Sequence, residues 1–186
     1  MSSFDDKEND LLILVNSNDE PIGELGKADC HVGDGTLHRA FSVFLFNDAG
    51  QVLIQQRSAN KPLWPLIWAN SCCSHPRVGE ETADAANRRI EEELGVSSSL
   101  TYLYKFEYQA RWDADKSEHE LCSVFAGHFD RELTVDRGEI ADWKLVTPAE
   151  LTAAIAADPD AYSPWLKLEW ERITADFLDD ILNKAA

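Results

Sequence analysis

One long helical pattern lies between stretches that favour strands, and this arrangement restricts the folds open to the chain. The pattern runs from Glu80 to Leu94 and ends at Gly95, the residue type that commonly follows the last turn of a helix. Strand-like runs precede and follow it, but strands and helices do not alternate strictly. The sequence therefore predicts an α+β (mixed α/β) fold, in which helices flank a mixed central sheet.

Turn and strand patterns organise the part of the chain before this helix. Residues 47–50, N-D-A-G, read as the turn of a hairpin, and residues 26–36 read as a loop with three glycines. The segment K-P-L-W-P-L-I-W-A-N, residues 61–70, contains two prolines, so it can be neither a regular helix nor a central strand. Strands are expected at residues 11–15, 22–25, 37–46 and 51–56.

The part of the chain after the helix is expected to contain three more strands and two more helices. The strands are predicted at residues 100–109, 120–127 and 142–146, and a short helix runs from Pro148 to about Ala156. Apolar residues then recur at three- and four-residue steps from Leu166 to Ile181, which predicts one amphipathic terminal helix. A length of 186 residues favours a single domain, 1–186, in which residues 1–10 form a flexible acidic N-terminus.

The charge of the chain excludes several kinds of partner. A formal charge of −17 argues against nucleic acid and against an anionic membrane surface. No run approaches the roughly 18 apolar residues that a membrane span requires. The acidic N-terminus has no apolar segment typical of a secretory signal, so a cytoplasmic location is expected. An anionic substrate would therefore need a local group of basic residues, or metal ions, to attract it.

Two neighbouring thiols stand beside a histidine in N-S-C-C-S-H-P, residues 70–76. In the cytoplasm a structural disulfide is not expected, so Cys30, Cys72, Cys73 and Cys122 are interpreted as buried, metal-binding or catalytic. If the chain is extended here, Cys73 and His75 face one way and Cys72 faces the other, toward packing. A thiol that nearby cations tune is expected to ionise close to neutral pH.

Three histidines and two glutamates form a candidate metal site. In S-E-H-E-L-C, a strand would place Glu118 and Glu120 on one face and His119 on the other. Singly, such residues are usually surface or core side chains, and two glutamates two apart are usually a solvated face. Together with the imidazoles they suit Mn²⁺, Zn²⁺ or Mg²⁺. The proposed ligands are His31, His38, His75, Glu118 and Glu120.

Residues 74–96 fit the Nudix signature in register. In such a loop and helix, a row of carboxylates coordinates Mg²⁺, which in turn holds a diphosphate. Ser74 replaces the first glycine of the signature and Arg89 replaces a glutamate, which puts ordinary diphosphate hydrolysis in doubt. Ser74 is expected to be tolerated unless the backbone there needs a positive φ. The residues that match are Glu80, Arg88, Ile90, Glu92, Glu93, Gly95 and Val96.

Longer motifs resemble the type 1 isopentenyl diphosphate isomerase family. They occur in that family's order between Lys27 and Trp165, and they are L-H-R-A-F, R-S-A-N-K-P-L-W-P-L-I-W-A-N-S-C-C-S-H-P, R-R-I-E-E-E-L-G-V, E-H-E-L-C and Y-S-P-W. The resemblance implies a Nudix-like fold and interconversion of isopentenyl and dimethylallyl diphosphates. It implies a divalent metal at the histidine–glutamate site, Mg²⁺ with the diphosphate and no flavin. A small prenyl diphosphate is the expected partner, and the protein is expected to be a monomer or a homodimer.

The resemblance also assigns roles to residues. Cys73 and Glu120 would be the catalytic pair, with Tyr108 assisting the glutamate, and Glu93 would help to hold the diphosphate-bound Mg²⁺. Trp165 would face the alkene, where its ring stabilises developing positive charge. The residues expected to bind the diphosphate are Lys27, Arg57, Lys61 and Arg89.

Two other functions remain open at this point. One is a Nudix diphosphohydrolase acting on a nucleotide or prenyl diphosphate, which Arg89 and the Cys73/His75 motif disfavour. The other is a non-catalytic binding protein in which Cys73, His75 and two further ligands hold structural zinc. The second leaves Glu118, Glu120 and Tyr108 without a role.

Overall fold

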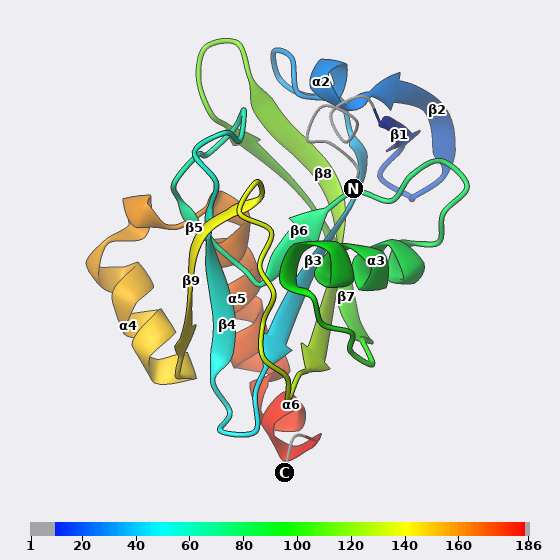
Figure 1. Cartoon of the computed structure of the whole chain (residues 1–186). Helices are drawn as coiled ribbons and strands as arrows, with labels where there is room; N and C mark the ends of the chain where they lie inside the picture. Colours follow the sequence, from blue (N-terminus) through cyan, green and yellow to red (C-terminus); the bar gives the residue numbers. More distant parts are fainter. Residues whose placement is uncertain (1–9, 185–186) are drawn as a thin grey trace.

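The structure is a computed structural model that describes residues 10–184 (Figure 1). The predicted flexible segment 1–10 therefore lies almost wholly outside the described residues. The helices are α2 (Lys27–Cys30), α3 (Thr82–Leu94), α4 (Pro148–Ala157), α5 (Pro164–Asp176) and α6 (Leu178–Lys184), with a 3₁₀ turn at Pro159–Ala161. The strands are β1 (Leu11–Val15), β2 (Pro21–Gly26), β3 (His38–Phe46), β4 (Val52–Arg57), β5 (Trp68–Ala69), β6 (Cys72–Ser74), β7 (Thr101–Arg111), β8 (Ser117–His128) and β9 (Ile140–Val146).

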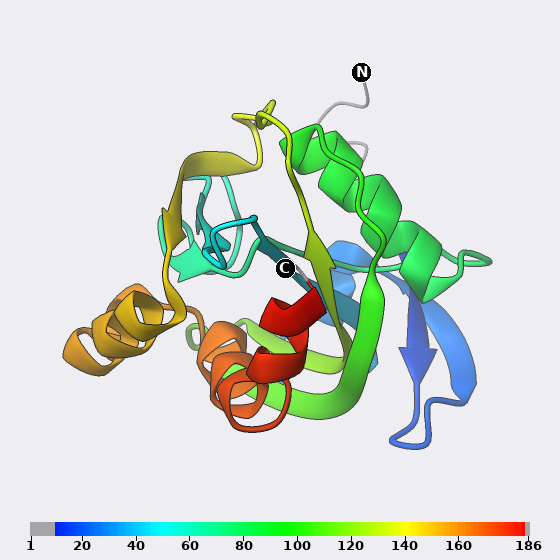
Figure 2. The ribbon, with the colours of Figure 1, turned by 90° about the horizontal axis from the view of Figure 1, so that it is seen from below.

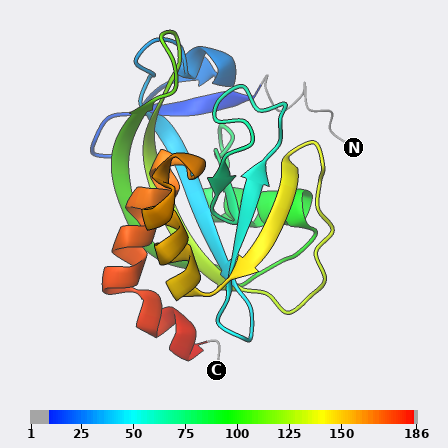
Figure 3. The ribbon, with the colours of Figure 1, turned by 90° about the vertical axis from the view of Figure 1, so that its left-hand side faces the viewer.

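Strand β3 organises a mixed sheet. It pairs in parallel with β8 along its whole length and antiparallel with β1 and β6. The predicted hairpin forms at the turn, but β3 and β4 pair only at Phe46 and Val52 and then diverge (Figure 3). They diverge because β6 pairs with β3, whereas β5 and β9 pair with β4. The predicted mixed sheet flanked by helices is confirmed.

Alternation along β3 divides the apolar core between the two faces of the sheet. Phe44 and Phe46 pack with α5, while Val43 and Leu45 pack with α3. Figure 2 shows α3 and the α5–α6 pair on opposite sides of the sheet. Such side chains each contribute about 1.5–3 kcal/mol when fully buried. The candidate site lies on the α5 side, as the register below shows.

The predicted single terminal helix is wrong, because the structure has two helices. Helix α5 ends at Asp176, Phe177 leaves the helical backbone region with φ −131°, and α6 begins at Leu178. The break lets Phe177 stack on Tyr104, with ring centroids 5.4 Å apart, while residues beyond it pack against the same core. No glycine or proline marks the break, so the apolar spacing continues through it.

The predicted loop 26–36 contains one helical turn, α2, which the three glycines concealed. Helix α3 begins at Thr82, two residues after the predicted start, and Gly95 ends it with a φ of 70° as expected. In the segment 61–70 only β5 is regular, as the two prolines predicted. Within residues 10–184 we find no helix of the length and apolarity that would carry it through a membrane.

Candidate active site and metal centre

The pairing of three strands places the carboxylates of β8. Glu120 lies opposite His38 of β3 and opposite Tyr108 of β7. Residues directly opposite one another on paired strands share a face, so these three side chains form a row across the sheet. Period two adds Glu118 to the same face, while His119 points the other way and contacts Glu107 at 3.2 Å. The predicted alternation in E-H-E is thereby confirmed.

Strand β6 brings the thiol to the same face. Cys73 lies opposite Ser42, which is four residues from His38 on β3, so both face the carboxylate row. Cys72 faces the other way and is fully buried against the α3 side, as predicted. Ser74 is not among the residues with positive φ, which explains why the glycine of the signature is not required here. All four cysteines are free.

His31 reaches the site from the loop that follows α2. The loop is attached to the start of β8, because Gly33 N donates to Asp115 O at 2.7 Å and Ser117 N donates to His31 O at 3.0 Å. Gly35 has a φ of 77°, and a Cβ there would lie 3.2 Å from Ser117 O. Glycine therefore permits both the turn and the close approach of the loop to β8.

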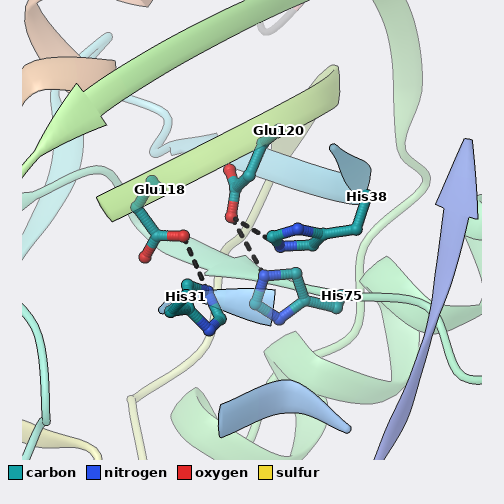
Figure 4. A group of neighbouring side chains, drawn as sticks. All are labelled: His31, His38, His75, Glu118 and Glu120. Atoms are coloured by element: carbon teal, nitrogen blue, oxygen red, sulfur yellow. Dashed lines mark hydrogen bonds and ion pairs between the residues drawn. The ribbon is translucent and has the colours of Figure 1, made fainter. Parts of the chain in front are cut away.

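The five predicted metal ligands converge. One ligand atom from each lies within 4.8 Å of all the others, and Figure 4 shows the side chains pointing toward one another. His31 Nε2 is 2.8 Å from Glu118 Oε2, and Glu120 Oε1 is 3.0 Å from His75 Nε2 and 3.8 Å from His38 Nε2. Distant segments of the chain thus form one compact group of nitrogen and oxygen atoms.

The hydrogen bonds of two imidazoles show what this group lacks. The Nδ1 atoms of His31 and His38 lie 2.6 Å from Lys27 O and 2.7 Å from Thr36 O, respectively. A carbonyl only accepts, so each Nδ1 carries a proton. The neutral ring of His38 therefore turns its Nε2 lone pair toward the carboxylates, whereas the Glu118 carboxylate raises the pKa of His31 against the effect of burial. His38 Nε2 is buried without a hydrogen-bond partner in residues 10–184. Acceptors facing acceptors fit a bound cation.

Burial and charge set the protonation of the ligands in the absence of an ion. Burial, reinforced by His31, lowers the pKa of His38 to about 4, and burial together with His38 also lowers the pKa of His75. Both imidazoles are therefore neutral, the form that binds metals. Burial raises the pKa of Glu120, and the neighbouring Glu118 carboxylate raises it further. For Glu118, the attraction of His31 outweighs burial and lowers the pKa.

Glu120 connects the ligand cluster to Tyr108. Its Oε1 faces the imidazoles, and its Oε2 accepts a hydrogen bond of 2.6 Å from the Tyr108 hydroxyl. Burial raises the pKa of Tyr108 well above its usual value, and the Glu120 carboxylate acts in the same direction. The hydroxyl therefore keeps its proton and donates it to Glu120 in a short hydrogen bond.

Cys73 keeps its proton as well. Burial raises the pKa of its thiol to about 12, although Arg57, whose Nη1 lies 3.7 Å from Sγ, opposes the shift. The expectation that cations bring this thiol close to ionisation at neutral pH is therefore wrong for the protein alone. Desolvation exceeds the attraction of one guanidinium.

Arg57 and Trp165 form the wall beside the thiol. The guanidinium lies 5.2 Å from the centre of the Trp165 ring and donates to Leu63 O at 2.9 Å and to Trp64 O at 3.0 Å. Trp165 donates from Nε1 to Asn70 Oδ1 at 3.1 Å. Both side chains are thus fixed by hydrogen bonds before any ligand binds.

Most of the predicted residues line one cavity. His38 is fully buried and does not line it, and Glu93 is buried in α3, where its carboxylate accepts hydrogen bonds from Arg89 and, at 3.4 Å, from Gln55. Glu93 is therefore not part of the five-ligand cluster, and its role with Mg²⁺ stays a prediction. The predicted residues that line the cavity are Lys27, His31, Arg57, Lys61, Cys73, His75, Arg89, Tyr108, Glu118, Glu120 and Trp165.

Several residues that the sequence analysis did not assign also line this cavity. Arg88 was noted only as part of the signature, and its guanidinium is bound by Glu80 at 2.7 and 2.8 Å. Lys116 lies in the turn before β8, and Glu139 precedes β9. Glu139 is one of 34 acidic residues, and nothing in the sequence around it distinguished it from surface glutamates.

Comparison with known proteins identifies this fold. A NUDIX domain model matches residues 36–167. A protein from Deinococcus radiodurans of known structure superposes with a TM-score of 0.65 at 26% identity, covering 80% of this chain and 90% of that one. A MutT protein from Methanosarcina mazei gives a TM-score of 0.63 at 13% identity, over 75% of this chain and 94% of that one, a likeness of fold alone.

Sequence relatives narrow the family further. The chain is 41% identical over 175 residues to isopentenyl-diphosphate Delta-isomerase 2 of Photorhabdus laumondii, covering 88% of this chain and 98% of the relative. It is 46% identical over 154 residues to the isopentenyl-diphosphate Delta-isomerase of Nocardia farcinica, covering 82% and 88%. Identity at this level over most of the chain shows membership of the same family and not only a shared fold. The chain belongs to the isopentenyl-diphosphate Delta-isomerases, within the Nudix domain family.

Proposed function

We propose that this protein interconverts isopentenyl and dimethylallyl diphosphates. One observation carries the proposal beyond family membership. The five-ligand cluster, the Cys73 thiol and the Tyr108–Glu120 hydrogen bond open into one cavity, whose other residues include Lys27, Arg57, Lys61 and Arg89. A cavity that combines acid–base groups with cations suits a small alkene that carries a diphosphate.

The reaction moves a double bond by one carbon. The electron pair of the terminal alkene takes up a proton at the methylene carbon, leaving a tertiary carbocation-like centre next to it. Loss of a proton from the carbon on the diphosphate side then forms the new double bond, so the composition does not change. Cys73 and Glu120 act as the two proton-exchanging groups, one delivering a proton and the other removing one. Tyr108 holds the Glu120 carboxyl by its 2.6 Å hydrogen bond.

Trp165 and the dry wall of the cavity protect the cationic centre. Trp165 is 3% exposed, and an aromatic ring that faces a desolvated cation contributes about 2 kcal/mol. Trp64 packs edge-on against it, with ring centroids 5.4 Å apart and planes at 90°. Exclusion of water from this side prevents capture of the cation as an alcohol.

His31, His38, His75, Glu118 and Glu120 are proposed to hold one divalent ion. Three imidazoles with two carboxylates favour Mn²⁺ or Zn²⁺ over Mg²⁺, which prefers oxygen ligands and water. When bound, such an ion supplies positive charge that makes the Glu120 carboxyl a stronger acid. Glu93 is proposed to help hold Mg²⁺ with the diphosphate. The cytoplasmic location and the monomeric or homodimeric state stay predictions.

Proton exchange in D₂O tests the proposed function. Metal-loaded protein incubated with isopentenyl diphosphate is expected to place deuterium in both isomers, and a chelator is expected to abolish the exchange. Cys73→Ala should lower the rate by roughly 10³-fold, the scale of a lost proton-transfer group, without unfolding the protein. Cys72→Ala removes the neighbouring thiol that faces away from the cavity and should retain activity. Absence of deuterium uptake by metal-loaded protein would refute the proposal.

The same samples test diphosphate hydrolysis. Arg89 lies where the signature has a glutamate, is 5% exposed and donates to Glu92 and Glu93, so it engages the carboxylates of α3 instead of adding one. We therefore expect no release of phosphate or diphosphate from prenyl or nucleotide substrates. Release at a rate comparable to isomerisation would favour the hydrolase.

A further inference from the structure

Glu139 joins two cations that are far apart in sequence. Its carboxylate accepts from Lys61 Nζ through Oε2 and from Arg89 Nη2 through Oε1, the latter at 3.1 Å. Lys61 comes from the loop after β4, Arg89 from α3 and Glu139 from the segment before β9. Glu139 is 2% exposed, so both contacts are largely shielded from water.

The backbone fixes Glu139 in this place. Its carbonyl accepts from Ser58 N at 2.9 Å, and its amide donates to Asp136 O at 3.1 Å. Asp136 N in turn donates to Glu93 O at 2.9 Å, at the end of α3. The segment is therefore attached both to the loop that carries Lys61 and to the helix that carries Arg89.

The two cations depend on Glu139 to different extents. Arg89 has other acidic partners in Glu92 and Glu93, and its Nε is buried without a hydrogen-bond partner in the described part of the chain. Glu139 is the only carboxylate within ion-pair distance of Lys61 among residues 10–184. Without Glu139, Lys61 would lose this anchor, and two like charges would face each other with little water to screen them.

We propose that Glu139 is a positioning residue for the diphosphate, and this inference rests on the proposed function. It holds Lys61 and Arg89 at the cavity in the arrangement that receives the two phosphoryl groups. A fixed arrangement spares the binding step the entropy of ordering two long side chains. The carboxylate is itself negative and repels a diphosphate, so its charge and its positioning effect act in opposite directions.

Because the two effects are opposed, the direction in which one substitution changes diphosphate binding distinguishes them. Glu139→Gln keeps the shape and removes the charge, so a purely electrostatic role predicts tighter binding of an anion. The positioning role predicts roughly tenfold weaker binding, and a higher KM with a nearly unchanged kcat, because the lost contacts do not reach the alkene. Glu91→Gln makes the same charge change on the exposed side of α3 and should leave binding within about twofold of wild type.

The binding experiment uses inorganic diphosphate with Mg²⁺, measured by titration calorimetry, so it does not depend on turnover. Lys61→Met is expected to weaken binding by roughly as much as Glu139→Gln, and the double variant no more than about twofold further, because both changes remove one arrangement. Tighter or unchanged binding by Glu139→Gln, or fully additive effects, would overturn the inference. A purely structural role would lower the melting temperature without this coupling.

Two further comparisons keep the outcomes separate. If Glu139→Gln does not fold, Glu139→Asp withdraws the carboxyl by one methylene while keeping its charge. Weaker diphosphate binding by that variant supports the inference, and binding as tight as that of wild type overturns it. If the wild type exchanges deuterium but the variants show no coupling in diphosphate binding, the inference about Glu139 alone is refuted. If the variants show coupled effects on diphosphate binding but the wild type exchanges no deuterium, the proposed isomerase function alone is refuted.

Discussion

Glu169 shows at the scale of one residue how the fold sets a charge. It lies in α5 and is fully buried, with Oε1 3.6 Å from Cys122 Sγ and Oε2 without a hydrogen-bond partner among the described residues. Burial raises the pKa of this carboxyl to about 8, although Ser42 and Cys122 oppose the shift. The folded protein therefore keeps Glu169 largely neutral at pH 7, in a core that would penalise an ion heavily.

This raised pKa predicts a dependence of stability on pH. The unfolded carboxyl has a pKa near the reference value of 4.5, so between about 4.5 and 8 the folded state holds a proton that the unfolded state releases. The stabilising effect is full below pH 4.5 and is lost as pH rises toward 8. Glu169→Gln should match wild type at pH 5 and exceed its free energy of unfolding above pH 8, by roughly 2–4 kcal/mol.

Denaturant unfolding of both proteins at pH 5 and pH 8.5 provides the measurement. Other titrating groups are common to the two proteins and cancel in the difference between them. A difference in unfolding free energy that does not change with pH would show that Glu169 titrates normally.

At the scale of elements, regular patterns in the sequence predicted the strands and helices, but local breaks in those patterns could not be predicted. Strands with clear apolar runs occur close to the predicted bounds, and Gly95 ends α3 as expected. The turn α2 and the break at Phe177 were missed because each depends on tertiary contacts. Helix α2 is attached through its following loop to β8, and Phe177 turns to reach Tyr104. Propensity carries no information about such contacts.

The loop after α2 carries a prediction of its own, because it supplies His31 and leads into His38. Gly35→Ala would place a Cβ 3.1 Å from His119 Cβ at a φ of 77°, so the loop must move away from β8. We expect this variant to lose about 1–3 kcal/mol of stability and to bind the divalent ion at least tenfold more weakly. Thermal unfolding and metal titration measure the two effects.

Gly33→Ala is the matched control. Gly33 has a φ of 63°, but apart from its two chain neighbours no described residue has an atom within 4 Å of the position that its added methyl group would take, so only backbone strain is added. It should lose about 1 kcal/mol and keep its metal affinity. Wild-type metal affinity in Gly35→Ala would mean that the approach of the loop to β8 does not position His31.

At the scale of the whole molecule, the site exists only because separate segments meet. The spacing in E-H-E and C-C-S-H predicted which side chains share a face, and the family resemblance predicted that these faces converge. The residues that support the site were harder to find, since Arg88 and Glu139 act through partners distant in sequence. Their types are common on the surface, and only the fold brings them to the cavity.

The charge of the molecule yields the last prediction. The protein carries −17 overall, yet Lys27, Arg57, Lys61 and Arg89 line its cavity. At about 0.01 M ionic strength the Debye length is about 30 Å, so an approaching diphosphate experiences the repulsion of the whole surface. At about 0.15 M the Debye length is about 8 Å. Salt then screens the repulsion of the surface more than it screens the attraction of the partly buried cations. Association should therefore become faster as salt rises.

We expect kcat/KM for isopentenyl diphosphate to rise about two- to fivefold between these ionic strengths, at constant free Mg²⁺. This is the reverse of the usual behaviour of a basic site on a basic protein, where salt weakens attraction at every distance. Sodium chloride and tetramethylammonium chloride should act alike, because screening depends on ionic strength and not on the identity of the ion. A steady fall in kcat/KM with either salt would mean that the cavity cations, and not the acidic surface, dominate the field that the substrate meets.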